Sequence, residues 1–354
     1  MHFWTNPCSI AIYCLWTLTL KTSLLGLPRC TRGISWDSRG VIKKALHRKR
    51  IYQSFKFICP WAFLGLVIAL FSSCTTLSIV TEILSGRDRD REIALQPVHW
   101  QERGPLRYTS GRIENPPLSF WVVAIDLDSP GLQVVVGPEP LEYGIVPSIR
   151  VSTFAKRYGC FAAINANPFD RVSNREGEPT RVIGIAFHEG QILSNPIPRY
   201  WALLIFKDGT ARIVPQNSLL LPDRTPDYQF LDSVRYAVGG FFPVLRDGIP
   251  LAGRGTRYPR SAVGVSQDGK ILYLLAINGR LLDSIGTTEH ETGQLLSILG
   301  AWEGILLDGG GSTSLVIQQT DGTYTILNHP VQEMELNFER AVATCIGFRI
   351  TGAW

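Results

Sequence analysis

One stretch of the chain combines an acid, three glycines and a hydroxyl side chain. An apolar run ends at Asp308, and Gly309, Gly310, Gly311 and Ser312 follow. Consecutive glycines allow positive φ angles, and they let backbone N–H groups face a ligand such as a phosphate. A nucleotide-binding P-loop is disfavoured, because its lysine is missing and no helix is expected to follow. The remaining alternative is a glycine-rich hairpin that binds nothing.

Five other segments share an order and spacing with this turn. They are Phe161–Asn165, Gly239–Gly248, Pro259–Val265, Ile277–Arg280 and Glu339–Ala343. Together with the Asp308 turn they resemble the phosphodiester glycosidase family, over roughly residue 120 to the C-terminus. The resemblance implies an enzyme that hydrolyses a sugar-1-phosphodiester at its glycosidic bond and releases a phosphate monoester. The partner would be a phosphorylated carbohydrate.

This chemistry needs two kinds of side chain, and the matching segments contain both. Arginine forks bind phosphate bidentately, and a carboxylate stabilises a positive anomeric carbon. The resemblance implies that Asp308, at the end of an apolar strand, and Glu291, on an expected helix, are catalytic acids. The predicted substrate-binding residues are Arg260, Arg280, Asn165, Asn278, Gly309, Gly310, Gly311, Ser312 and Gly240.

Each assignment has a structural alternative. Asp308 could hydrogen-bond its own turn, and the two arginines could pair with nearby surface acids. Glu291 fits the third position of a helix that is capped by Thr288, which alone would explain an acid there. Asn165 could cap a turn. Gly239 and Gly240 could serve close backbone packing.

The chain departs from the family pattern at two places. Asn278 stands where the family commonly has Asp, and an amide can act neither as a base nor as a full negative charge. After Asn165 a more usual glycine-and-aromatic run is replaced, and Asp170 could supply a carboxylate nearby. Asn278 keeps a second function open, namely a non-catalytic glycan-binding protein in exopolysaccharide assembly or export.

The apolar pattern predicts an α+β fold, with a strand-rich single catalytic domain of mixed sheets and a few helices. Regular structure is expected to begin at Ser119. Apolar runs around Asp-Gly and Glu-Gly turns predict hairpins. The expected pairs are 182–187 with 191–193, 201–206 with 211–214, and 262–265 with 271–277. Helices are expected at 148–158 and 289–299, the second with Thr288 as N-cap and Gly300 after its end.

The charge distribution divides the chain. Its 354 residues carry a formal net charge of +5, but residues 1–74 contain ten Lys or Arg and one acid. That leaves 25 basic and 29 acidic residues in 75–354, a net charge of −4. A nucleic-acid partner is therefore not expected. The predicted divisions are an N-terminal extension with a signal or anchor (1–74), a polar linker or leading segment (75–118) and the glycosidase-like domain (119–354).

The N-terminal part predicts export. A basic run at 43–56 precedes an apolar run at 57–71, followed by small residues, which is typical of a secretory signal. Residues 70–74 also resemble a bacterial lipobox, in which Cys74 would carry the lipid. The expected location is secreted or membrane-tethered through this segment, outside the cytoplasm. A simple membrane anchor is the alternative, and we suspect that the true start lies near Val41.

Five of the seven cysteines lie in residues 1–74, which leaves Cys160 and Cys345 in the domain. Apolar neighbours favour buried thiols over a disulfide at these two positions. No cysteine and histidine spacing resembles a zinc site. The sequence identifies no cofactor, and a metal requirement stays open.

Overall fold

The computed structural model describes residues 92–351 except 95–97, 105, 254, 333–334 and 337. The predicted signal or anchor segment, the suspected start near Val41 and the lipidation candidate Cys74 lie outside the described residues. Within them, no helix has both the length and the apolar character needed to cross a bilayer.

An eight-stranded sheet with strand order β1-β2-β3-β16-β15-β17-β13-β14 forms the largest layer. Each neighbouring pair is antiparallel. Its strands are β1 (Gln101–Arg103), β2 (Leu106–Ile113), β3 (Leu118–Asp126), β13 (Pro243–Arg246), β14 (Ile249–Pro250), β15 (Arg260–Val265), β16 (Ile271–Ile277) and β17 (Glu303–Leu306).

Two five-stranded sheets complete the layers, in the orders β11-β10-β12-β8-β9 and β19-β18-β6-β22-β4. The strands of the first are β8 (Ala186–His188), β9 (Gln191–Ser194), β10 (Trp201–Phe206), β11 (Ala211–Pro215) and β12 (Val234–Gly240). Those of the second are β4 (Leu132–Gly137), β6 (Ala162–Asn165), β18 (Leu315–Gln318), β19 (Tyr324–Ile326) and β22 (Cys345–Ile350). Two small ribbons pair β5 (Ile145–Pro147) with β7 (Pro179–Arg181) and β20 (Val331–Gln332) with β21 (Glu335–Leu336).

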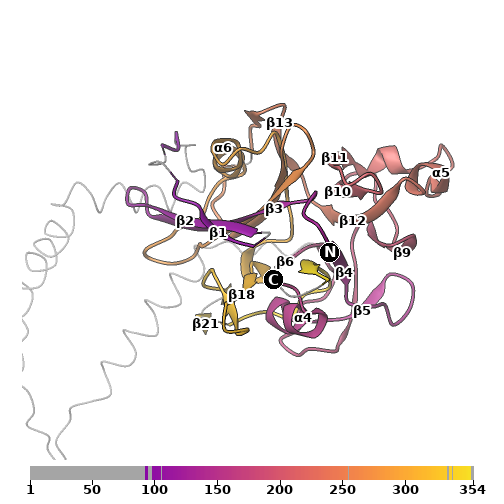
Figure 1. Ribbon diagram of the computed structural model, residues 1–354, viewed down its shortest axis with the longest axis horizontal. Coiled ribbons are helices and arrows are strands. Elements are labelled where there is room, and N and C mark those ends of the chain that lie inside the picture. Colours follow the sequence, from indigo (N-terminus) through magenta and orange to yellow (C-terminus); the bar gives the residue numbers. More distant parts are fainter. Residues whose placement is uncertain are drawn as a thin grey trace, which may run out of the picture. The chain divides into compact units, whose positions relative to one another are not determined.

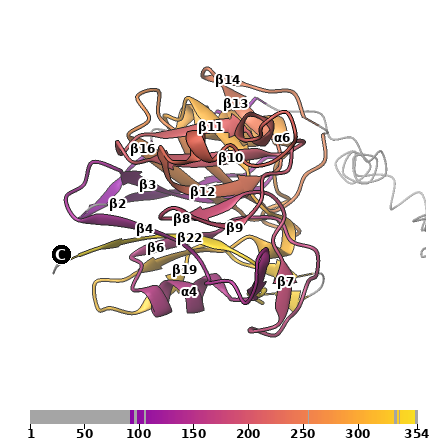
Figure 2. The same ribbon diagram turned by 90° about the vertical axis from the view of Figure 1, so that its right-hand side faces the viewer.

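The described residues contain three α-helices, α4 (Val151–Tyr158), α5 (Tyr228–Leu231) and α6 (Glu289–Ile298). Two short 3₁₀ helices, η1 (Gln216–Leu219) and η2 (Gly310–Ser312), also occur. Helix α6 packs on β13, β14 and β17, whereas α4 packs on β6, β18 and β19. The two helices therefore cover different sheets, and Figure 2 shows α6 and α4 on opposite sides of the strand layers (Figures 1 and 2).

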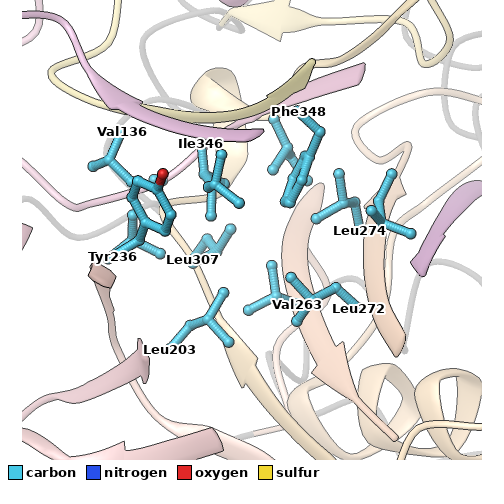
Figure 3. Packing of buried hydrophobic residues seen from close by; sticks show 14 of the residues in the cluster. Val136, Leu203, Tyr236, Val263, Leu272, Leu274, Leu307, Ile346 and Phe348 are labelled. Carbon is cyan, nitrogen blue, oxygen red and sulfur yellow. The ribbon is translucent and has the colours of Figure 1, made fainter. Parts of the chain in front are cut away.

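The main core lies where the three sheets face one another. Figure 3 shows Val263 and Leu274 of the large sheet, Leu203 of the β10 sheet and Phe348 of the β22 sheet meeting in one apolar cluster. All four side chains are fully buried. Burial of a side chain of this size contributes roughly 1.5–3 kcal/mol, so the cluster joins the sheets into one unit.

The local sequence signals are confirmed. The hairpins β8–β9, β10–β11 and β15–β16 form as expected. Helix α6 begins with the predicted capping box between Thr288 and Glu291, and Gly300 follows its C-cap with a φ of 106°. Cys160 and Cys345 are buried free thiols. Burial raises the pKa of Cys160 to about 12, which keeps this thiol protonated and unreactive.

Two expectations about the sheets are wrong. Regular structure does not begin at Ser119, because β2 pairs with β3 along its whole length and buries Leu106. Polar residues on the other positions of β2 hide this strand in the sequence. Neighbouring strands of each sheet are also antiparallel rather than mixed in the described residues, although α6 connects β16 to β17, which flank β15 in the large sheet.

Candidate functional site

The Asp308 turn follows the end of β17, next to the end of β6. The Asp308 backbone N–H donates to the carbonyl of Ala166 (3.0 Å), which fixes where the turn starts. The side chain is half-buried, and its carboxylate accepts a hydrogen bond from the Ser312 hydroxyl. Burial raises the pKa of Asp308 to about 6, although Ser312 and the positive charge of Arg340 act in the opposite direction. The acid can therefore change its charge near neutral pH.

The glycines of this turn let other groups approach its backbone. Gly310 has a φ of 62°, and a Cβ atom there would lie 3.3 Å from Arg280 Nη2. A Cβ atom on Gly311 would overlap the guanidinium of Arg340. On Gly309 it would lie 3.0 Å from the carbonyl oxygen of Pro259. The turn is thus glycine-rich because two arginines and a neighbouring loop pack directly on its main chain.

The two predicted phosphate-binding arginines meet at one aromatic ring. The Cζ atoms of Arg260 and Arg280 lie 5.4 and 5.9 Å from the centre of the Tyr258 ring. Neither arginine forms an ion pair with a carboxylate in the part of the chain that the structure describes, so the surface-pairing alternative is not what is observed. Two like charges on one ring repel each other, and a bound anion would offset that repulsion.

Arg260 and Arg280 are held in different ways. Arg260 is partly buried, and it donates to the carbonyls of Thr287 (3.2 Å) and Thr256 (3.0 Å). Burial lowers the pKa of its guanidinium. Arg280 is exposed and has a φ of 60°, a conformation that non-glycine residues rarely adopt. In this conformation the exposed guanidinium of Arg280 lies near Gly310 of the turn. The hydrogen-bonded guanidinium of Arg260 lies on the same Tyr258 ring.

Asn165 lies in the hydrogen-bonding network beneath the turn. It is fully buried, and its amide oxygen accepts from the Ser261 hydroxyl (2.7 Å) and the Ser314 N–H (3.2 Å). Its amide nitrogen donates to the carbonyl of Asp308. Asn165 therefore ties β6, β15 and the glycine turn together. This arrangement positions Asp308, and direct contact of Asn165 with a sugar stays a prediction.

Asn278 is buried and bonded to a histidine that the sequence did not single out. Its amide oxygen accepts from the His329 N–H (2.9 Å), and its amide nitrogen lies 3.3 Å from His329 Nδ1. The exposed His329 ring lies 6.0 Å from the ring of Trp121. Asn278 and His329 thus form an amide–imidazole pair. Sugar binding by Asn278 stays a prediction.

Glu291 has the position that the capping interpretation expected. It is fully buried, and its carboxylate accepts from the Thr288 backbone N–H (3.0 Å). The same carboxylate forms an ion pair with Arg257 at 2.7 Å, in which both side chains are buried. These partners account for an acid here without any chemistry. A direct catalytic role for Glu291 stays a prediction that the geometry does not favour.

Gly240 and Asp170 have local explanations. A Cβ atom on Gly240 would overlap the carbonyl oxygen of Leu306, so this glycine lets β12 approach β17 closely. Asp170 is exposed, and its carboxylate accepts from the Arg181 N–H (2.9 Å) and the Thr180 hydroxyl (3.3 Å). Neither residue is linked to the Asp308 turn by a hydrogen bond or an ion pair in the described part of the chain.

Sequence reasoning missed three residues that contact the predicted site residues. Tyr258 lies beside Arg260 and Arg280, His329 bonds Asn278, and Arg340 lies against Gly311. Arg340 donates to the Ser312 hydroxyl (3.3 Å), so it supports the same group that bonds Asp308. Arg340 belongs to the segment 339–343, which resembles the family, and this resemblance could have identified it as a site residue. Among the described residues, no three side chains of His, Cys, Asp or Glu gather closely enough to hold a metal ion.

Comparisons with known proteins agree with this geometry. A family model described as phosphodiester glycosidase matches residues 158–349, which is more than half of the chain. The SPbeta prophage-derived uncharacterized protein YomE of Bacillus subtilis is 24% identical over 194 residues. These cover 52% of this chain and 28% of that protein, so the chain spans little more than a quarter of this curated relative.

Similar solved structures include a hypothetical protein from Synechocystis, with a TM-score of 0.54 and 16% identity. The match covers 74% of this chain and 65% of that one. A putative exported protein from Burkholderia pseudomallei has a TM-score of 0.50 and 15% identity, covering 66% and 74%. The catalytic domain of zebrafish N-acetylglucosamine-1-phosphodiester alpha-N-acetylglucosaminidase, auto-inhibited by its pro-peptide, has a TM-score of 0.49 and 17% identity, covering 76% and 87%. At these identities the first two likenesses concern the fold alone.

Proposed function

Because the chain belongs to the phosphodiester glycosidase family, we propose that it hydrolyses the glycosidic bond of a sugar-1-phosphodiester. The products would be a free sugar and a phosphate monoester. The observation that carries the proposal is the arrangement around Asp308. A half-buried acid with a raised pKa sits in a glycine turn that is flanked by Arg280 on Gly310 and Arg340 on Gly311.

The reaction assigns separate tasks to these groups. The bond between the anomeric carbon and the phosphate oxygen breaks, and its electron pair leaves with the phosphate. Arg280 and Arg260 hold the phosphodiester charge as it becomes a monoester dianion. The Asp308 carboxylate faces the positive charge that develops at the anomeric carbon. A water oxygen then joins that carbon, and the water releases a proton. The leaving phosphate is already a stable anion, so it needs little protonation.

Asn278 bears on the non-catalytic alternative. An amide cannot accept a proton at this position, but both of its polar atoms are already directed at His329. Asn278 therefore supports the loop that carries His329, and the charge at the turn comes from Asp308. Glycan binding without turnover would be the result that favours the alternative.

The bond that is cleaved can be identified with labelled water. The full chain is incubated in ¹⁸O-water with synthetic 1-phosphodiesters of N-acetylglucosamine, glucose and rhamnose, and the products are followed by ³¹P NMR and mass spectrometry. We expect the phosphate monoester to carry no label, because the water oxygen joins the anomeric carbon and not the phosphorus. A label in the phosphate would mean cleavage of the P–O bond. Tight binding of every substrate without any product would remove the glycosidase proposal.

We further propose that the substrate is an envelope or extracellular glycan that the chain reaches after export. The basic and apolar runs at 43–71 and the lipobox-like residues before Cys74 support this location. In a bacterial host, Cys74→Ala should release the protein from the membrane or leave it unprocessed, while the domain still folds. A mature N-terminus well beyond Cys74, or a cytoplasmic protein, would contradict the lipoprotein proposal.

A further inference from the structure

A second polar cavity lies away from the Asp308 turn. It has a volume of about 510 Å³, and it opens between β4, the β8–β9 hairpin, the end of α4 and β22. Cys345, at the start of β22, pairs with Asn165 next to the catalytic turn. Arg349 lines the cavity four residues further along the same strand, which corresponds to roughly 13 Å. The cavity is therefore a separate place on the molecule.

Arg349 brings a fixed positive charge to this cavity. Its Nε donates to the side chain of Gln133 (2.9 Å), and one terminal nitrogen donates to the carbonyl of Tyr158 (3.4 Å). Both partners are neutral. In the described part of the chain, Arg349 forms no ion pair with a carboxylate. An oriented arginine whose two hydrogen-bond partners are neutral can bind a carboxylate or a phosphate group.

His188 adds a second donor. Its Nδ1 accepts from the backbone N–H of Val136 (3.3 Å), so in the neutral ring the proton is on Nε2. Burial lowers the pKa of His188, which favours this neutral form. Because the imidazole lines the cavity, Nε2–H can donate to a bound oxygen without adding a second charge.

The rest of the lining suits the body of a sugar. The exposed side chains of Glu139 and Gln191 offer acceptors and a donor for hydroxyl groups at the rim. Val136 and Leu193 provide an apolar floor, against which the C–H face of a pyranose ring can pack. A simple anion would use only Arg349 and His188 and would leave Glu139 and Gln191 without a partner. A neutral sugar would leave the Arg349 charge without a partner.

We propose that this cavity is a second carbohydrate site that binds an acidic monosaccharide unit, with its carboxylate or phosphate on Arg349 and His188 and its hydroxyls on Glu139 and Gln191. The site does not depend on the hydrolysis assigned to Asp308. It would hold another acidic residue of a glycan chain, or a free acidic sugar.

Equilibrium dialysis of the full chain tests this site with four labelled probes, which are D-glucuronate, glucose 6-phosphate, glucose and inorganic phosphate. We expect one of the acidic sugars to bind saturably and at least about tenfold more tightly than glucose, because one charge-assisted hydrogen bond corresponds to about that factor. The tighter of the two acidic sugars identifies the acidic group. Inorganic phosphate that binds as tightly as glucose 6-phosphate would overturn the sugar part of the proposal.

Variants locate the binding. Arg349→Gln should remove the preference for acidic over neutral probes, whereas Arg349→Lys should keep part of it. Gln191→Ala, at an exposed position, should weaken acidic sugars without affecting folding. The matched control Arg224→Gln, at an exposed arginine outside the cavity, should change nothing. Asp308→Asn should leave binding intact. Unchanged binding in both Arg349→Gln and Gln191→Ala, or its loss in Asp308→Asn, would overturn the second site, as would a failure of both acidic sugars to saturate.

Discussion

Asp308 and Glu291 are two acids of the same domain, and their surroundings differ in every respect that affects a carboxylate. Glu291 is fully buried. Its carboxylate accepts a hydrogen bond from the Thr288 backbone N–H at the start of α6 and forms an ion pair with Arg257. Asp308 is half-buried, accepts from the Ser312 hydroxyl and the Gly309 backbone N–H, and forms no ion pair within the described residues. Its pKa is raised to about 6.

This difference supports the proposal that Asp308 is the reactive acid and that Glu291 is structural. The carboxylate of Glu291 is bonded to Arg257 and to the Thr288 N–H, so displacing this side chain would disrupt the start of α6. The charge of Asp308 is stabilised mainly by groups of its own turn, and Arg280 and Arg340 lie against the neighbouring glycines. A buried acid with few partners is therefore the better candidate for chemistry than a buried acid with many.

The largest change in stability should come from breaking the buried ion pair between Glu291 and Arg257. Glu291→Ala leaves Arg257 buried without its carboxylate and removes a bond from the Thr288 N–H. We expect the free energy of unfolding to fall by about 3–5 kcal/mol, as in other broken buried pairs. Urea unfolding measures this loss. Glu142→Ala, at an exposed acid, should stay within about 0.5 kcal/mol. Equal stability of both variants would contradict the structural role of Glu291.

Replacing Asp308 should raise the free energy of unfolding rather than lower it. Its pKa in the folded state is raised from 3.8 to about 6, so the folded protein holds the proton more tightly than the unfolded chain. The contribution of Asp308 to stability is then fully present below about pH 4 and is lost as the pH rises through about 6. Asp308→Asn removes the buried charge and should raise the free energy of unfolding at pH 8 by up to about 3 kcal/mol.

The pH dependence provides the check for this stabilisation. The gain from Asp308→Asn should disappear as the pH is lowered through 6 towards 4. Asp223 is a suitable control, because the Thr225 hydroxyl and N–H lower the pKa of this exposed acid. Asp223→Asn should therefore shift stability slightly in the opposite direction at pH 8. If Asp308→Asn were less stable than the wild type at pH 8, the Asp308 carboxylate would stabilise the fold, as that of Glu291 does.

A smaller effect is expected for the arginine fork. Arg260→Lys and Arg280→Lys keep the charge and lose the planar fork, so each should lower turnover of a sugar-1-phosphodiester by about tenfold. Turnover of an uncharged glycoside, if it occurs, should change little. Because both guanidinium groups lie on Tyr258, the double variant should lose less than the sum of the single losses. Strict additivity would mean that the two residues do not share a phosphate.

The sequence predicted best what depends on neighbours along the chain. The Asp-Gly turns define hairpins, and the box from Thr288 to Glu291 starts a helix, because each signal lies within a few residues. The strand β2 was missed, because it contains few apolar residues and they do not alternate along its length. The glycine turn and its acid were recognised as one contiguous motif.

The rest of the site depends on contacts that the sequence does not display. Asn165 bonds Asp308 across 143 positions, and Asn278 bonds His329 across 51. Tyr258 and His329 can be recognised as neighbours of the predicted site residues only in the fold, where Tyr258 contacts Arg260 and Arg280 and His329 bonds Asn278. An isolated tyrosine or histidine carries no local signal of this kind. The conformation of Arg280, with its positive φ, is likewise set by the fold.

The central claim is that Asp308, and not Glu291, is the reactive acid. Turnover of one sugar-1-phosphodiester by wild-type protein and by folded Asp308→Asn tests it most directly, with Glu291→Gln as the comparator. We predict that Asp308→Asn lowers kcat by at least about a hundredfold with much less change in substrate binding, as for loss of one electrostatic catalytic group. Glu291→Gln should lose far less turnover where it folds. Wild-type turnover in folded Asp308→Asn would reduce Asp308 to a turn residue and contradict the claim.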